Sequence, residues 1–277
     1  MAKGIGLIGN FKGKVGNMVG YKLSDSNTGN TQGIRVYQPI VKNPKTSAQA
    51  EQRAKLAPIN ATYRALKMII DRGNEGLPYG NKSRLAWLKN AFKAETMPWF
   101  DKGEKVNAPV CSQLTKGSLP SIAAFSNSDE NIKLQVSGVS TSTATLGALS
   151  TALLAQYSSL KNGDQITFVG TELYNENMYV YVDSFVIDST STATVPSFIG
   201  LDTDYIEWTK TMGALSAGCI IVSREGTNGE HLRSTEPLYK MNGYGSNHTS
   251  QEAKESAIRS YMASASANAD WAEESIQ

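Results

Sequence analysis

The sequence predicts an α+β protein in which an N-terminal β-hairpin and helices are followed by an antiparallel, β-rich, sandwich-like domain. Helical periodicity is concentrated between residues 46 and 94, and β-prone segments dominate residues 132–223. The 277-residue chain is 40% hydrophobic, which is enough for substantial cores and suits a division into more than one part.

The sign of the net charge reverses near residue 116. Residues 1–116 contain 19 Lys and Arg against 7 Asp and Glu, a net charge of +12, whereas residues 117–277 contain 8 against 18, a net charge of −10. We therefore expect a basic hairpin-and-helix module (1–116), an acidic β-rich domain (117–248) and a C-terminal helix and tail (249–277).

The N-terminal hairpin is predicted from two β-prone, partly alternating segments, residues 14–22 and 33–38. Residues 24–30, between them, have the composition of a loop, and Pro39 and Pro44 end the extended part.

A long helix is predicted next, with Thr46 as its N-cap and Gln49 completing a capping box. Pro58 predicts a kink or break, and Gly73 a stop. The expected apolar face consists of Leu56, Ile59, Tyr63, Leu66 and Ile70. A second helix is expected over residues 83–94, with an apolar face of Leu85, Leu88 and Phe92.

Residues 101–120 are interpreted as a linker or crossover because they are mixed in composition and contain two prolines. Beyond them, the expected strands are residues 132–136, 165–169, 178–187 and 218–223. Turns are expected at residues 162–164 and 227–229, and helices over 148–160 and 250–276.

Composition argues against several classes of protein. No apolar stretch approaches the 18 or so residues of a membrane span, and the N-terminus lacks a signal-peptide pattern, so we expect no membrane partner and no Sec export. Cys111 and Cys219 are expected to be buried thiols rather than a disulfide.

No motif indicates a catalytic, cofactor or metal site. Gly4, Gly6 and Gly9 match a dinucleotide fingerprint only formally, because further glycines follow instead of a helix, and we interpret the segment as glycine-rich β structure. A Walker A sequence and a zinc-ligand spacing are both missing, and the two histidines, His231 and His248, are expected to face solvent. We therefore expect no cofactor, no metal and no enzymatic activity.

Close pairs of carboxylates could serve acid–base chemistry or bind a cation, but solvated faces are the simpler interpretation. The pairs are Asp183 with Asp188, Asp202 with Asp204, and Glu172 with Glu176. A hydrolase using Asp183, Asp188 or His231 is the least favoured hypothesis, since no nucleophile, base and orienting group stand out together.

The basic half interleaves cations with aromatic residues, which suits either phosphates and bases or an acidic protein surface. The cations are Lys12, Lys14, Lys22, Arg35, Lys42, Lys45, Arg53, Lys55, Arg64, Lys67, Arg72, Lys82, Arg84, Lys89 and Lys93. The interleaved aromatic residues are Phe11, Tyr21, Tyr37, Tyr63, Trp87 and Phe92. Charge alone leaves both partners open.

Two segments carry a family resemblance. Residues 9–20 follow the pattern G-x-F-x-G-K-V-G-N-x-V-G, and residues 43–53 follow N-P-x-T-x-A-Q-x-x-x-R at the start of the long helix. These segments resemble a family of uncharacterised proteins encoded by Bacteroidota genomes and by phages of these bacteria. Residues 218–224 and 232–235 resemble its C-terminal part. The resemblance covers the first 70 residues well and implies a phage context rather than a mechanism.

With that context, we expect a non-enzymatic virion structural or accessory protein, made in the bacterial cytoplasm and anchored to other virion proteins by residues 1–116. It is also expected to contact copies of itself in a symmetric assembly. The alternative is a nucleic-acid-binding protein, packaged with the genome, that uses the basic half. The expected partner-binding residues are Phe11, Lys12, Lys14, Asn17, Tyr21, Arg35, Asn43 and Arg53.

Overall fold

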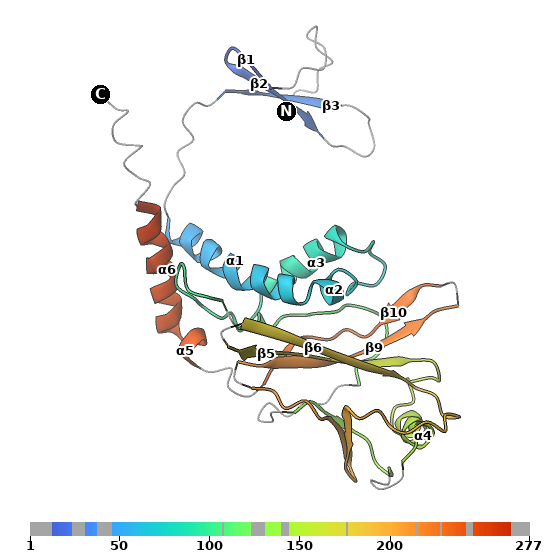
Figure 1. Cartoon of the computed structure of the whole chain (residues 1–277). Coiled ribbons are helices and arrows are strands. Elements are labelled where there is room, and N and C mark those ends of the chain that lie inside the picture. Colours follow the sequence, from blue (N-terminus) through green and yellow to red (C-terminus); the bar gives the residue numbers. More distant parts are fainter. Residues whose placement is uncertain are drawn as a thin grey trace. The chain divides into compact units, whose positions relative to one another are not determined.

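The computed structural model confirms an α+β fold with antiparallel sheets (Figure 1). The structure describes residues 13–23, 31–37, 46–106, 108–122, 131–139, 144–175, 177–213, 215–227, 229–241 and 246–266. The chain separates into two compact units, Met1–Pro44 (the first unit) and Lys45–Gln277 (the second unit).

The first unit contains a three-stranded antiparallel sheet, which we call the N-terminal sheet. Its strands are β1 (Gly13–Val15), β2 (Met18–Leu23) and β3 (Thr31–Val36), in the order β1-β2-β3. The expected hairpin corresponds to β2 and β3, whereas residues 14–22 are not the single strand that we predicted. Gly16 and Asn17 form a two-residue turn, and Gly16 has φ +56°, as the first central residue of a type II′ turn requires. Residues 24–30, Pro39 and Pro44 lie outside the described residues.

The second unit is built on a five-stranded antiparallel sheet, the central sheet. It comprises β5 (Gln165–Tyr174), β6 (Asn177–Val186), β9 (Ala217–Glu225), β10 (His231–Arg233) and β11 (Tyr239–Lys240). The strand order is β10-β9-β5-β6, and β11 also pairs with β9. The long strands β5, β6 and β9 lie where the sequence predicted strands, and alternate side chains of β5 and β9 enter two separate cores.

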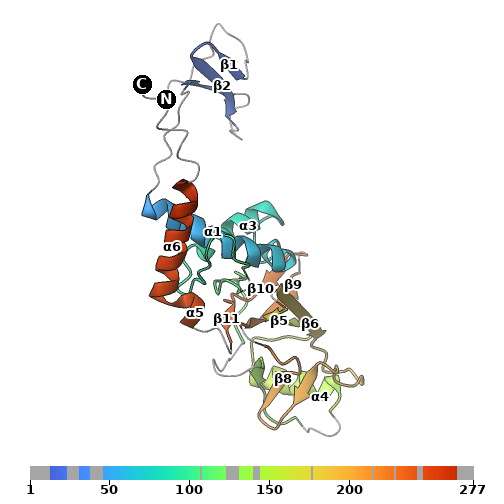
Figure 2. The same ribbon diagram turned by 60° about the vertical axis from the view of Figure 1, so that its left-hand side comes forward.

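Helices cover one face of the central sheet, as Figures 1 and 2 both show. They are α1 (Ser47–Ala65), α2 (Lys67–Ile70) and α3 (Asn81–Ala91). Helix α6 (Gln251–Ser266), which follows the short α5 (Ser246–Thr249), packs against α1. The Thr46 side chain accepts a hydrogen bond from the Gln49 N–H at 3.3 Å, so the predicted N-cap is confirmed.

The long helix differs from the prediction in where it breaks and in which side it buries. α1 continues through Pro58 to Ala65, and its C-cap, Leu66, leaves the helical region with φ −98° and ψ 20°. Pro58 and its neighbour Ile59 are buried, so packing against the sheet outweighs the lost helix hydrogen bond. Leu56 and Leu85, expected on apolar faces, are exposed because the buried faces are centred on small residues and Trp87.

The sequence predicts a linker or crossover over residues 101–120. In the structure, residues 108–122 do not link separate domains, because they pack into a core of the second unit. Val110 and Leu114 are buried in the core that α1–α3 share with Val169, Cys219 and Ile221 of the central sheet. The Leu114 N–H also donates to the Glu236 carbonyl oxygen at 2.8 Å. The described contacts therefore divide the chain after Pro44 and not at residue 116, because the helices complete the core of the sheet.

A second layer covers the other face of the central sheet (Figure 2). It contains helix α4 (Leu146–Gln156) and a three-stranded sheet. The strands of this sheet, in order, are β4 (Lys133–Gln135), β8 (Tyr205–Trp208) and β7 (Ile199–Leu201). Gly170 and Gly218 lie opposite each other in β5 and β9, and a Cβ atom at either would fall within 2.5 Å of a side chain in the core between the layers, that of Met212 or Ile132. The missing side chains thus permit the close approach of the two layers.

No helix among the described residues is both long enough and apolar enough to cross a membrane.

Candidate partner-binding site

One face of the N-terminal sheet is basic and aromatic. Lys14, Val19 and Arg35 are directly opposite one another across β1, β2 and β3, so they lie on the same face. The Lys14 Nζ lies 3.6 Å from the centre of the Tyr37 ring, a cation–π contact. The Tyr37 N–H donates to the Asn17 carbonyl oxygen at 2.6 Å, which ties the end of β3 to the turn. Lys14, Asn17 and Arg35 are all exposed.

The opposite face of the N-terminal sheet exposes apolar side chains. Met18 and Val36 are directly opposite each other in β2 and β3, and they are 40% and 76% exposed. Among the described residues of the first unit there is no helix to cover either face. Burying these apolar side chains against another protein would remove them from water, so this face is suited to a protein partner.

The structure brings together only part of the predicted partner-binding set. Lys14, Asn17 and Arg35 belong to the N-terminal sheet, and Tyr21 lies in β2 opposite Gly33. The side chain of Tyr21 and the whole of Phe11, Lys12 and Asn43 are outside the described residues.

Arg53 belongs to the second unit, where it is exposed on α1. It lines a shallow cavity of about 350 Å³ together with Leu56, Asn60, Lys102 and Tyr261.

Helices α1–α3 and the turns that follow α2 and α3 carry a second set of exposed cations, which we call the helical basic surface. Its exposed cations are Arg64, Lys67, Arg72, Lys82, Lys89 and Lys93. Two arginines lie over aromatic rings: Arg84 is 4.5 Å from the centre of the Tyr63 ring, and Arg72 is 5.6 Å from that of Tyr79. This arrangement of charge and rings suits phosphates and stacked bases.

The carboxylates considered for catalysis accept hydrogen bonds from neighbouring groups. Asp183 accepts a hydrogen bond from the Trp208 Nε1 at 2.8 Å. Asp188 accepts from the Thr190 hydroxyl and N–H, at 2.7 and 2.9 Å, and these bonds lower its pKa. Asp202 accepts from the Thr203 N–H and hydroxyl in the same way, and its pKa is lowered too. Glu176 lies outside the described residues.

The two histidines contact aromatic residues. His231 stacks on Tyr79, with ring centres 6.2 Å apart, and His248 stacks on Phe100 at 4.6 Å. His231 is exposed, as expected. His248 is partly buried, contrary to the expectation, and its Nδ1 lies 3.3 Å from the Trp99 carbonyl oxygen. Neither contacts a carboxylate and a nucleophile together within the described residues.

Glu172 is a buried carboxylate on the face of β5 that looks toward the second layer. It accepts hydrogen bonds from the Tyr181 hydroxyl at 2.6 Å and the Gly213 N–H at 2.7 Å, and the Lys210 Nζ lies 3.6 Å away. Burial raises the pKa of Glu172, but the hydrogen bonds and Lys210 outweigh it, and the net pKa is lowered. Glu172 therefore fixes the loop after β8 against the central sheet.

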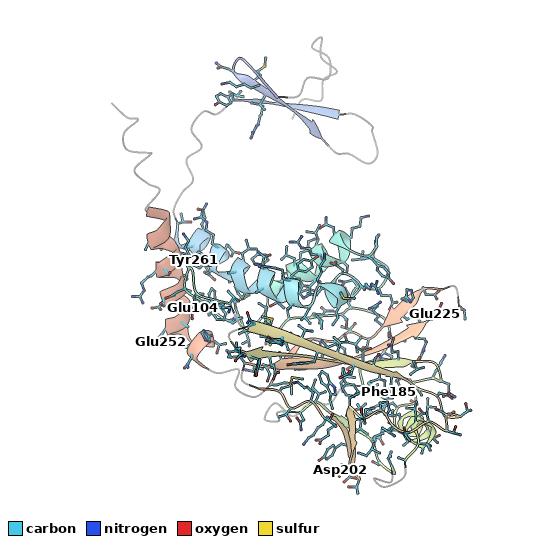
Figure 3. The ribbon with its side chains drawn as sticks, viewed as in Figure 1. Glu104, Phe185, Asp202, Glu225, Glu252 and Tyr261 are labelled. Atoms are coloured by element: carbon cyan, nitrogen blue, oxygen red, sulfur yellow. The ribbon has the colours of Figure 1, made fainter. Side chains whose placement is uncertain are left out.

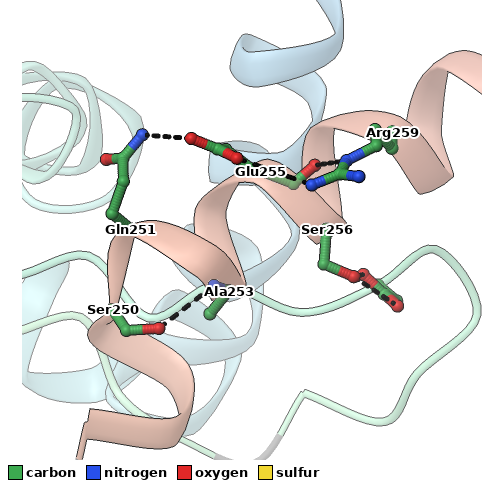
Figure 4. Close-up of polar contacts among 7 residues, drawn as sticks. Ser250, Gln251, Ala253, Glu255, Ser256 and Arg259 are labelled. Carbon is green, nitrogen blue, oxygen red and sulfur yellow. Dashed lines mark hydrogen bonds and ion pairs between the residues drawn. The ribbon is translucent and has the colours of Figure 1, made fainter.

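Two further features carried no signal in the sequence. The first is an acidic pocket of about 650 Å³ beside α6, lined by Trp99, Asp101, Glu104, His248 and Glu252 among others. Figure 3 shows Glu252, which belongs to α6, and Glu104 close to the same helix. Figure 4 shows that Ser250 accepts from the Ala253 N–H. The Ser256 hydroxyl donates to the Asp101 Oδ1 at 3.1 Å. The pocket combines residues about 150 positions apart, which no local pattern reveals.

The second feature is Glu236, which is fully buried. Its Oε2 accepts from the Ser121 hydroxyl at 2.9 Å, whereas its Oε1 has no hydrogen-bond partner in the described part of the chain. Burial raises the pKa of Glu236. Cys219 is fully buried as well, and burial raises the pKa of its thiol, which disfavours the reactive thiolate. Cys111 and Cys219 form no disulfide, as predicted.

No group of three or more His, Cys, Asp or Glu within the described ranges is arranged to hold a metal ion. Comparisons with protein-family models, with curated proteins and with solved structures yield no match to this chain. The resemblance to a family of Bacteroidota and phage proteins therefore stays a prediction.

Proposed function

We propose that the protein is a non-enzymatic structural or accessory component of a bacteriophage particle and that the N-terminal sheet binds other virion proteins. The observation that carries the proposal is that sheet itself, a separate unit with one basic, aromatic face and one exposed apolar face.

The geometry favours a protein partner for this sheet. Cations and aromatic rings are common anchors of protein interfaces, and Lys14 and Arg35 would meet an acidic surface. On the other face, Met18 and Val36 would be removed from water by the same partner or by a second chain.

The virion context rests on the resemblance carried by residues 9–20 and 43–53. The first of these segments includes the Gly16-Asn17 turn, and the second includes the Thr46 cap of α1. The resemblance thus falls on the N-terminal sheet and on the entry to the second unit.

The first experiment is quantitative mass spectrometry of purified particles of the source phage, with stoichiometry against the major capsid protein. We expect a fixed copy number compatible with the symmetry of the particle. Absence of the protein from particles would discard the virion role.

A binding experiment tests the N-terminal sheet directly. We expect the double charge reversal Lys14→Glu and Arg35→Glu to weaken capture of virion proteins from dissociated particles by about tenfold or more, because cations facing an acidic partner become repulsive. The double reversal Lys116→Glu and Lys161→Glu, at two exposed lysines of the second unit outside the helical basic surface, is the matched control and should leave capture unchanged. Equal capture by all three proteins would exclude the basic face as the binding site.

Nucleic-acid binding is the second candidate function, and the helical basic surface is the observation that favours it. Its cations would neutralise phosphates, so binding should fall steeply with salt and should be lost when Lys67, Lys82, Lys89 and Lys93 are replaced by Gln. A flat salt dependence, measured by fluorescence anisotropy with single- and double-stranded DNA, would rule this function out.

A further inference from the structure

Strand β6 forms an open edge of the central sheet. It is the last strand in the order β10-β9-β5-β6, and it is ten residues long. Within the described ranges, no strand pairs with its outer side. A long open edge presents a row of backbone donors and acceptors that can pair with another strand.

The backbone groups at this edge can be assigned from the hydrogen bonds at the end of the strand. Ile187, directly after β6, donates its N–H to the Asp164 carbonyl oxygen and accepts from the Gly163 N–H, both at 2.8 Å. Because bonded and non-bonded residues alternate along an antiparallel pair, the odd-numbered residues of β6 bond to β5. The N–H and C=O groups of Met178, Val180, Val182, Ser184 and Val186 therefore point outward.

The side chains at this edge lack the usual protection against pairing. Val182 and Val186 are 50% and 48% exposed on the face that carries the helices, and Tyr179 is exposed on the other face. Asp183 is the only charged residue in β6, and the strand contains no Lys and no Pro.

We propose that β6 pairs with β6 of a second copy of this chain, antiparallel, about a two-fold axis at Val182. In this register Val182 is opposite Val182, Met178 is opposite Val186, and Val180 is opposite Ser184. Each pair then consists of residues whose backbone groups point outward, and the exposed valines cover each other. The result is a continuous sheet across two molecules.

Charge favours this register over its neighbours. It places Asp183 opposite Tyr181 of the second copy, and the Lys210 Nζ lies 3.9 Å from the centre of that tyrosine's ring. The carboxylate of Asp183 in one molecule thus approaches the Lys210 cation of the other, and two-fold symmetry repeats this contact on the other side of the axis. Moving the axis to Asp183 would set two carboxylates opposite each other, and moving it to Tyr181 would leave Val186 opposite no residue of β6.

This interface goes beyond the proposed function, because it lies in the second unit and requires no virion protein. The purified full chain can therefore test it alone, and failure of the virion role would leave it standing.

Disulfide crosslinking tests the register. Residues opposite each other in a bonded pair have Cα atoms about 5.5 Å apart, within the range for a disulfide. We expect Val182→Cys to form a covalent dimer under mild oxidation. Ser184→Cys is the matched control, since the two copies of residue 184 would be about 13 Å apart along the strands. The unmodified chain controls for Cys111 and Cys219.

Light scattering after size-exclusion chromatography tests the interface itself. We expect a dimer for the unmodified chain, a monomer with an unchanged circular dichroism spectrum for Val182→Lys, and a dimer for Met68→Lys, which alters a 78% exposed methionine on α2. At about 100 µM, well above a Kd of the dimer in the micromolar range, the unmodified chain should be dimeric. A monomer at this concentration would overturn the proposal. So would equal crosslinking of the two cysteine variants or a dimer that survives Val182→Lys.

Discussion

At the scale of single residues, a buried ion pair fixes the start of the β5–β6 hairpin. Asp164 is fully buried and accepts from the Nε and a terminal nitrogen of Arg224 at 2.6 and 2.7 Å. The same terminal nitrogen donates to the Ser159 carbonyl oxygen at 2.8 Å. The pair holds the loop that precedes β5 against β9.

We predict that Asp164→Asn lowers the free energy of unfolding by about 3 kcal/mol, because removing one partner leaves the other charge partly buried and uncompensated. Urea unfolding followed by circular dichroism measures the change. The control is Glu255→Gln, which disrupts the exposed pair with Arg259, whose closest N–O distance is 3.5 Å. This control should alter the free energy of unfolding by no more than about 0.5 kcal/mol. Equal losses for the two variants would show that the buried pair of Asp164 stabilises the fold no more than an exposed pair does.

Glu236 makes the stability of the second unit depend on pH. Its pKa is raised in the folded protein, chiefly by burial, so folding favours its neutral form. The stabilisation from this group is complete below the ordinary glutamate pKa and is lost as the pH rises through the raised pKa.

We therefore predict that Glu236→Gln is about as stable as the unmodified chain in acid and more stable at neutral pH. The free energy of unfolding of both proteins, measured across this range, gives the comparison. A difference that does not grow with pH would mean that Glu236 is compensated by a group that we have not identified.

At the scale of elements, Thr62 joins helix α1 to the irregular segment 108–122. Its hydroxyl donates to the Pro58 carbonyl oxygen and accepts from the Val110 N–H, both at 2.8 Å. Thr62 is buried, so water cannot replace either bond. The hydroxyl thus satisfies a backbone donor that lies outside regular secondary structure.

Thr62→Val should cost about 1–3 kcal/mol of unfolding free energy, since the shape is kept while the Val110 N–H loses its acceptor. Thr62→Ser keeps the hydroxyl and should cost less, and thermal unfolding of the two variants distinguishes them. A serine variant that is the less stable of the two would assign the effect to the methyl group.

At the scale of the whole molecule, the two units differ in what stabilises them. Both hydrophobic cores consist of residues from Ala54 onward, and the contacts cluster separately before and after Pro44. The second unit has its own layers and cores, whereas the N-terminal sheet has none among its described residues.

We predict that deletion of residues 1–44 leaves the thermal midpoint of the second unit within a few degrees of that of the full chain, because its cores stay complete. Differential scanning calorimetry makes the comparison. A much lower midpoint would show that the first unit stabilises the second.

The sequence by itself determined the fold class, the cap at Thr46 and the positions of β5, β6 and β9, because alternation and capping are local properties of the chain. It also singled out Lys14, Asn17 and Arg35, which are exposed on the N-terminal sheet.

Only the tertiary structure decided which layers share a core, and hence that the chain divides after Pro44 and not where its charge reverses. The same holds for the burial of Glu236, the continuation of α1 through Pro58 and the open edge of β6. Each depends on which distant segments meet, and free energy from packing between them outweighs the local preferences that a sequence displays.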